Sequence, residues 1–274
     1  MSYVSRLEWS SDGAFLLAQS HQGSWILDSS QHGHSCHIGD LSHQDLGFIS
    51  DHVFIVGQNS VSGTTALSFF NTSCVRVGDA VTPFAINFGD ASDAAGLIAA
   101  SNPGEGVEIL RSMSLEKISA VRDARTGLRV VFFGAGKGFC AGAEKPDGDA
   151  TMRCWSLGLK GPVEVSTFPA RNASVLPVAS ARAASLIAIG YAALSYNHFS
   201  EGRTSKFKGW TIWDPLNGQT RGTVAAKIQA FRFISEQKHP RQAPYAAALS
   251  AKGGLFAVAG NQTLEVFSVP PERE

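Results

Sequence analysis

The chain of 274 residues carries 23 basic and 23 acidic residues, so its formal net charge at pH 7 is zero. A balanced charge gives no field that would attract nucleic acid or an anionic membrane, and we expect neither as a partner. Hydrophobic residues make up 44% of the chain and charged residues 17%, and there are 28 glycines. This composition favours a β-rich fold with many tight turns, in a chain long enough to bury a sizeable core.

Targeting signals and cysteine usage indicate an intracellular protein. Residues 1–6 lack the apolar core of a signal peptide, and the apolar stretch near residues 183–194 is too short to cross a membrane. The four cysteines lie far apart, with no CxxC pair: Cys36, Cys74, Cys140 and Cys154. So few cysteines in so large a chain do not indicate a disulfide framework, and we predict free thiols in a cytoplasmic protein.

The first thirty residues predict three short strands joined by tight turns. Residues 4–9 alternate as a half-buried strand does, and residues 10–13 form a Ser-x-Asp-Gly turn. Residues 14–19 are apolar, and residues 24–27 form a third strand that ends at Asp28. The unit is therefore strand, turn, strand, turn, strand.

Weaker copies of this unit return five more times. The third strands end near residues 27, 70, 110, 155, 213 and 267. The best-preserved copy lies at residues 208–220, where an alternating run ends at Trp213-Asp214 and an Asn217-Gly218 turn follows. The early intervals are close to the period of about 40 residues that four-stranded repeats show.

These residues resemble the WD-repeat β-propeller family. Residues 10–29 are similar to the core of one blade, Trp213-Asp214 is the family's dipeptide, and Gly33-His34 is its Gly-His pair. The resemblance implies an all-β fold, a single propeller over residues 1–274 with six or seven four-stranded blades. The six blades are expected near residues 1–40, 41–80, 81–120, 121–170, 171–227 and 228–274.

Fourth strands are expected at the outer edge of the blades. Their predicted positions are residues 35–38, 74–77, 115–118, 163–168 and 220–225. Residues 35–40 and 73–79 share a Ser-Cys start and a Gly-Asp end, and we interpret them as two copies of one element. The five tryptophans fall mostly on strand positions, which predicts that they are core residues.

Two segments make the last intervals longer than the repeat, and both are polar and rich in turn formers. They lie at residues 195–207 and 235–243, where we expect insertions or mobile loops. Five aromatic and basic residues in the first segment have the composition of a protein-binding hot spot: Tyr196, Phe199, Arg203, Lys206 and Phe207. The alternative is a loop that packs its own aromatics onto the blade surface.

The last blade is expected to be incomplete. The first clear strand begins at Val4, and the chain ends at residues 270–274, just after the last third strand. An unpaired strand edge would then remain, which a partner strand or a second copy completes by β-augmentation. Alternatively, the chain is a piece of a longer propeller protein.

One group of residues has metal-ligand spacing. His32, His34 and Cys36 alternate, so on a strand they share one face. The alternative is a polar loop between blades, and we expect no metal here because real sites need a closed ligand set.

Other motifs that could carry chemistry have simpler structural interpretations. Residues 134–138 are glycine-rich but lack the spacing and the following helix of a phosphate loop, which favours a β-turn. The remaining carboxylates are expected in solvated or turn-forming positions. They are Glu144, Asp147 and Asp149 on one turn, and Asp12, Asp51, Asp90 and Asp93 at blade turns.

No motif in the sequence indicates a specific chemistry, so a binding role is the simplest interpretation. The resemblance implies a non-catalytic scaffold or adaptor subunit that binds other proteins and uses no cofactor. The alternative is a propeller-based hydrolase with a metal or ligand at the central pore, drawn from innermost strands of different blades.

Overall fold

The computed structural model describes most of the chain, and its regular elements are all strands. The described residues are 4–10, 12–20, 23–28, 30, 35–39, 44–50, 53–59, 63–86, 88–92, 94–102, 106–122, 129–142, 152–168, 173–181, 184–197, 202–225, 231–232, 241–242, 246–250, 252–260 and 263–270. Among them, no helix has the length and apolar character needed to cross a membrane.

The strands form six antiparallel blades and one short ribbon. Blade 1 contains β1 (Val4–Trp9), β2 (Phe15–Ser20), β3 (Gly23–Asp28) and β4 (Ser35–Gly39). Blade 2 contains β5 (Gln44–Ser50), β6 (Val53–Asn59), β7 (Thr65–Asn71) and β8 (Arg76–Thr82). Blade 3 contains β9 (Phe88–Ser92), β10 (Leu97–Asn102), β11 (Gly106–Arg111) and β12 (Lys117–Val121).

The second half of the chain repeats this order. Blade 4 contains β13 (Arg129–Phe133), β14 (Gly138–Gly142), β15 (Met152–Gly158) and β16 (Gly161–Phe168). Blade 5 contains β17 (Ala173–Ser180), β18 (Ile187–Asn197), β19 (Gly202–Asp214) and β20 (Gln219–Val224). The ribbon of β21 (Phe231–Arg232) and β22 (Arg241–Gln242) precedes blade 6, which contains β23 (Ala246–Leu249), β24 (Leu255–Gly260) and β25 (Thr263–Ser268).

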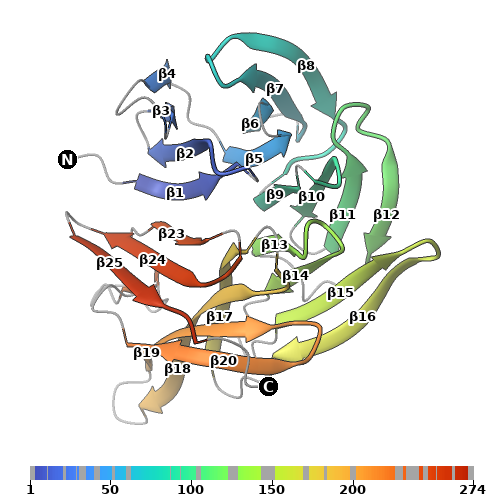
Figure 1. Ribbon diagram of the computed structural model, residues 1–274. Coiled ribbons are helices and arrows are strands. Elements are labelled where there is room, and N and C mark those ends of the chain that lie inside the picture. The colour runs from blue at the N-terminus through green and yellow to red at the C-terminus, as the bar shows by residue number, and fades with distance from the viewer. Residues whose placement is uncertain are drawn as a thin grey trace.

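The blades are arranged in a closed ring, with the first strand of each blade innermost (Figure 1). Each innermost strand contacts the innermost strand of the next blade, and β1 contacts β23 to close the circle. The predicted all-β propeller with six blades is confirmed. The last blade has three strands within the described residues.

Five buried apolar clusters fill the spaces between successive blades. Leu17 of blade 1 and Phe54 of blade 2 belong to one cluster, and Trp213 of blade 5 packs with Cys154 of blade 4 in another. The other three lie between blades 2 and 3, blades 3 and 4, and blades 5 and 6. Alternation along each strand therefore supplies apolar side chains to both faces of a blade.

Two of the predicted fourth strands begin later than expected. The expected residues 74–77 and 115–118 lie partly in turns, because Cys74 and Leu115 adopt φ of 58° and 54°. Left-handed conformations interrupt the extended backbone. Residues 35–40 and 73–79 are therefore not two copies of one element: Cys36 lies within β4, whereas Cys74 lies in the turn before β8.

The cysteines form two disulfides, so the prediction of free thiols is wrong. Cys36 and Cys74 join the outer strand of blade 1 to a turn of blade 2, with their Cα atoms 5.7 Å apart. Cys140 and Cys154 are directly opposed on β14 and β15, with Cα atoms 4.1 Å apart. Sequence spacing could not show that strands bring these cysteines together, and paired cysteines give no indication of a reducing compartment.

Two buried carboxylates join neighbouring blades in equivalent ways. The backbone N–H of Phe48 on β5 donates to Glu8 on β1 at 3.1 Å. The backbone N–H of Phe132 on β13 donates to Asp90 on β9 at 2.7 Å. Asp90 is therefore a contact between blades and not the turn former that the sequence predicts.

We expect all four cysteines to resist alkylation until they are reduced. Treatment with iodoacetamide in denaturant should label none of them, and treatment after reduction should label four, as read by intact mass. Replacing Cys36 and Cys74 together by alanine should lower the free energy of unfolding by about 3 kcal/mol, because the unfolded chain gains conformational entropy when the cross-link is removed. Labelling without reductant would contradict the pairing.

The inter-blade carboxylate gives a second prediction. Asp90→Ala should lower the free energy of unfolding by about 2 kcal/mol, since a buried N–H loses a charged acceptor. Asp79→Ala is the matched control because Asp79 lies on an exposed strand face with Arg76 as its ion-pair partner. Its cost should stay below about 1 kcal/mol. Equal losses in urea titrations of the two variants would refute a special role for Asp90.

Candidate partner-binding surfaces

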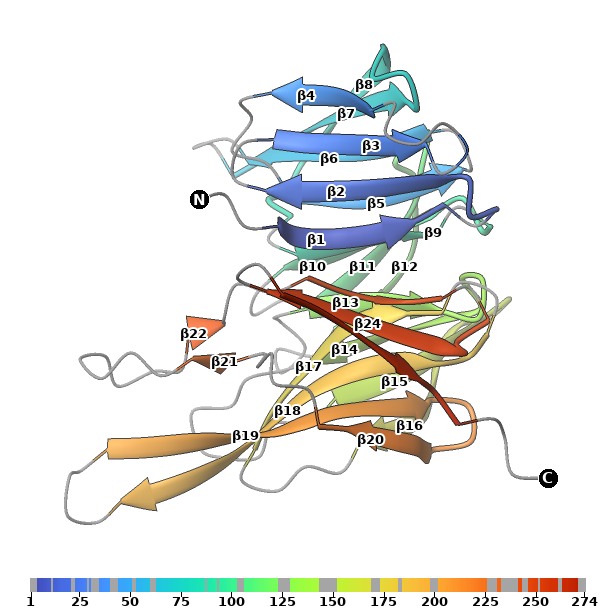
Figure 2. The same cartoon turned by 60° about the vertical axis from the view of Figure 1, so that its left-hand side comes forward.

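The segment expected to be an insertion or a mobile loop at residues 195–207 is a two-stranded ribbon where it is described. β18 and β19 continue past the end of blade 5 as an antiparallel pair, in which Tyr196 is opposite Arg203 and Ala192 is opposite Phe207. Figure 2 shows this ribbon extending well beyond the other blades. The turn-forming residues mark the segment as an insertion but do not show that its residues pair as strands.

The register divides the ribbon into two faces. Directly opposed residues of an antiparallel pair share a face. Tyr196, Arg203 and Phe207 lie on one face, which we call the aromatic face, and Leu194 shares it. Lys206 lies on the opposite face with Ser195 and Thr204. By register, three of the five predicted residues therefore lie on one face, while Phe199 lies outside the described residues.

The second predicted insertion, at residues 235–243, is described at only two positions. Arg241 and Gln242 pair with Arg232 and Phe231 to form the short β21–β22 ribbon. The other residues of this segment lie outside the described part of the chain.

Blade 6 presents an outer strand that is rich in exposed apolar residues. Within the described residues, β25 pairs with β24 and with no strand on its other edge. Leu264 and Val266 on β25 are 64% and 56% exposed, and Leu255 on β24 is 50% exposed. Trp9 on β1 is 37% exposed, whereas Trp155, Trp210 and Trp213 are buried as predicted. Sequence reasoning missed this group, because alternation alone marks these positions as core.

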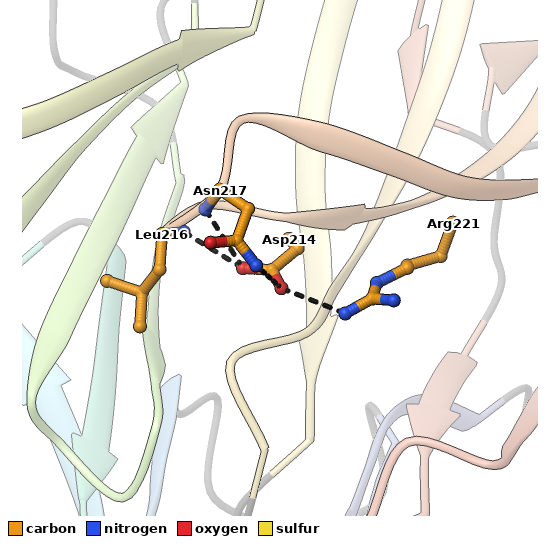
Figure 3. Close-up of polar contacts among 4 residues, drawn as sticks. All are labelled: Asp214, Leu216, Asn217 and Arg221. Carbon is orange, nitrogen blue, oxygen red and sulfur yellow. Dashed lines mark hydrogen bonds and ion pairs between the residues drawn. The ribbon is translucent and has the colours of Figure 1, made fainter. Parts of the chain in front are cut away.

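The Trp-Asp dipeptide has a structural role. The Asp214 carboxylate is buried, and its Oδ1 accepts hydrogen bonds from the backbone N–H groups of Leu216 and Asn217 at 3.0 and 3.3 Å. Its Oδ2 accepts from Asn217 Nδ2 at 3.0 Å and from Arg221 Nη2 at 3.3 Å. Figure 3 shows these four contacts converging on one side chain. They hold the β19–β20 turn, in which Gly218 has the predicted positive φ of 64°.

The weak metal candidates do not form a site among the described residues. Cys36 is bonded to Cys74, so its sulfur is not a thiolate ligand. His32 and His34 lie outside the described residues. In the part of the chain that the structure covers, no three His, Cys, Asp or Glu residues are grouped to hold a metal ion.

The glycine-rich residues 134–138 form a turn between β13 and β14, as predicted. Lys137 donates its backbone N–H to Gly134 at 3.2 Å, and the turn is followed by a strand. A side chain at Gly136 would meet Ala95 and Ser92 of blade 3 at 2.5 Å, so the turn packs against the neighbouring blade. This leaves no helix dipole or open cradle for a phosphate.

Of the other predicted turn carboxylates, Asp12 is described and behaves as expected. Its Oδ1 accepts from the Ala14 backbone N–H at 2.9 Å and from the Ser10 hydroxyl at 2.6 Å. Such Asx contacts stabilise a turn. The remaining candidates lie outside the described residues: Asp51, Asp93, Glu144, Asp147 and Asp149.

Comparisons with known proteins support the fold. No protein-family model matches the chain, and no curated protein matches its sequence. Among solved structures, the β-propeller domain of Cps50 (Swd1) from Myceliophteria thermophila matches with a TM-score of 0.62 and 13% identity, over 97% of this chain and 83% of that chain. The β-propeller fold is confirmed, but identity this low assigns no function.

The Asp214 network predicts a large loss of stability on its removal. Asp214→Ala should lower the free energy of unfolding by about 3 kcal/mol or more, because Arg221 is left mostly buried without its carboxylate. Glu116 is a matched control because it pairs with Arg111 at 3.3 Å with both side chains exposed. Glu116→Ala should therefore cost less than about 1 kcal/mol. Denaturant titration of both variants checks the difference, and a smaller loss for Asp214→Ala than for Glu116→Ala would refute it.

Proposed function

We propose that the chain is a non-catalytic scaffold that binds protein partners. The observation that carries this proposal is the β18–β19 ribbon, which projects from blade 5 with its aromatic face separated from a polar face. Aromatic and arginine residues together are the composition of binding hot spots.

The body of the propeller suits such a role. Five apolar clusters and the closed ring of innermost strands hold the blades in fixed positions. A rigid body presents its ribbon and edges to a partner with little loss of conformational entropy on binding. The match to the β-propeller domain of Cps50 agrees with this architecture and supports it at the level of the fold.

A second contact is proposed at blade 6. The outer edge of β25 is available for a further strand within the described residues. A partner that adds a strand there would bind through backbone hydrogen bonds, as in other cases of β-augmentation. The ribbon and this edge would then act as two separate contacts of one scaffold.

The ribbon is tested by comparing its two faces. Tyr196→Ala with Arg203→Ala removes an opposed pair from the aromatic face, and Ser195→Ala with Thr204→Ala removes one from the polar face. Cross-linking should recover a partner protein at least about tenfold less with the first variant than with the wild-type chain, which corresponds to a loss of roughly 1.4 kcal/mol in binding free energy. The second variant should recover the same partner at the wild-type level.

Both variants should keep the thermal midpoint of the wild-type chain to within about 2 °C. A large drop in the midpoint for the aromatic-face variant would show that these residues are core. Equal recovery of partners by the two variants would remove the ribbon from the proposed function.

A further inference from the structure

We propose that the seam between blade 6 and blade 1 is a docking groove for one extended segment of a protein partner, which becomes the fourth strand of blade 6. This inference rests on the proposed scaffold function and specifies how one of its contacts is made. It follows from a comparison of the six seams of the ring with one another.

Each of the other five seams contains an apolar residue from a fourth strand. The outer strand of every complete blade contributes to the cluster that its blade shares with the next one. The contributing residues are Ile38 of β4, Ala80 of β8, Val121 of β12, Phe168 of β16 and Val224 of β20. The fourth strand is therefore a regular part of each seam.

Within the described residues, the sixth seam, between blades 6 and 1, has neither a fourth strand nor a buried apolar cluster. Blade 6 has three strands, and none of the five buried clusters joins it to blade 1. Phe256 and Phe267 pack toward blade 5, so Leu255, Leu264 and Val266 face blade 1 by alternation. These are the exposed large apolar residues of blade 6, and within the described residues no fourth strand lies beside them.

Blade 1 shows the complementary surface. Leu17 and Ile26 pack toward blade 2, so Trp9 and Trp25 lie on the face toward blade 6. Trp9 is exposed, and Trp25 stacks on the exposed His37 ring of β4 at 4.5 Å. Two apolar faces therefore oppose each other across the seam.

The space is suited to one strand and not to a whole blade. β1 and β23 contact each other directly, so the ring is already closed at the central channel. Within the described residues, β25 ends the sheet of blade 6, so a strand is absent only at the outer part of the seam. In Figure 2 the sheet of blade 6 diverges from β1 toward its outer strand.

The described chain after β25 leads away from the seam. The Val269 backbone N–H donates to Gly254 at 2.9 Å, and Val269 is buried in the cluster with blade 5. Pro270 lies beside Gly222 on β20 of blade 5, where an added Cβ would be 3.4 Å from the proline ring. The chain thus covers the face of blade 6 that is already packed.

A second copy fits the seam less well than a separate segment. It would offer its own β25, whose Phe267 face is covered by its own blade 5. The occupant is therefore an extended segment with a free backbone edge for β25. It carries β-branched or aromatic side chains at every second position toward blade 1, and no proline where β25 is paired.

A tethered strand tests this without the natural partner. The full chain is extended by a 20-residue Gly/Ser linker, with a reach of about 25 Å, and then by Thr-Val-Thr-Val-Thr-Val-Thr. Intramolecular delivery raises the effective concentration to about the millimolar range. We expect the thermal midpoint to rise by about 5 °C, and the amides of β25 to exchange more slowly with deuterium. A fusion ending in Thr-Pro-Thr-Pro-Thr-Pro-Thr should show neither effect.

Matched surface variants locate the effect. Leu264→Arg with Val266→Arg should abolish both the rise and the protection. Val77→Arg with Val81→Arg on β8 should leave them intact, since these valines are 53% and 64% exposed on a complete blade. No rise in the midpoint and no protection with the valine strand, or an equal rise in the Leu264 and Val266 variant, would overturn the proposal.

Native mass spectrometry of the unextended chain separates a partner from a second copy. We expect a monomer at both low and high micromolar concentration. A dimer that Leu264→Arg with Val266→Arg dissociates would overturn the partner in favour of a second copy. Failure of the ribbon variants alone would affect the proposed function and leave this result intact, because the tethered strand does not use the ribbon.

Discussion

The structure depends on covering both faces of every blade. A four-stranded sheet with apolar residues on both faces cannot remain in water alone, and each blade meets this constraint by packing against two neighbours. The ring is the geometry in which every blade has a neighbour on each side. Contacts that are specific to single seams then fix the blades: the Glu8 and Asp90 carboxylates, and the disulfide between Cys36 and Cys74.

Much of this fold could be predicted from the sequence, because its signals are local. The alternation of residues 4–9 and the turn at Asn217-Gly218 depend on neighbours in the chain, and both were located correctly. The positive φ at Cys74 and Leu115 could not be read from residue types that rarely adopt it, so two outer strands were placed too early. Both disulfides join residues that only strand pairing brings together.

The candidate surfaces, too, could be predicted only in part from the sequence. The composition of the ribbon was visible in Tyr196, Arg203 and Phe207, but their shared face required the register of β18 with β19. Leu264 and Val266 resemble core residues in every local respect. Only the count of strands in the sheet and their exposed fractions show that they are not buried. A surface that depends on which strands pair in the sheet cannot be recognised from the residues next to it in the sequence.

The open seam is a consequence of how the other five are filled. Blade 6 is fixed on one side by its cluster with blade 5, and blade 1 is fixed on its other side by its cluster with blade 2 and the disulfide. Moving the outer parts of blades 6 and 1 relative to each other would require one of these packed interfaces to open. Packed interfaces of this kind resist continuous deformation. The rest of the ring therefore fixes the position of β25, so the proposed strand would bind with little cost of rearranging the blades.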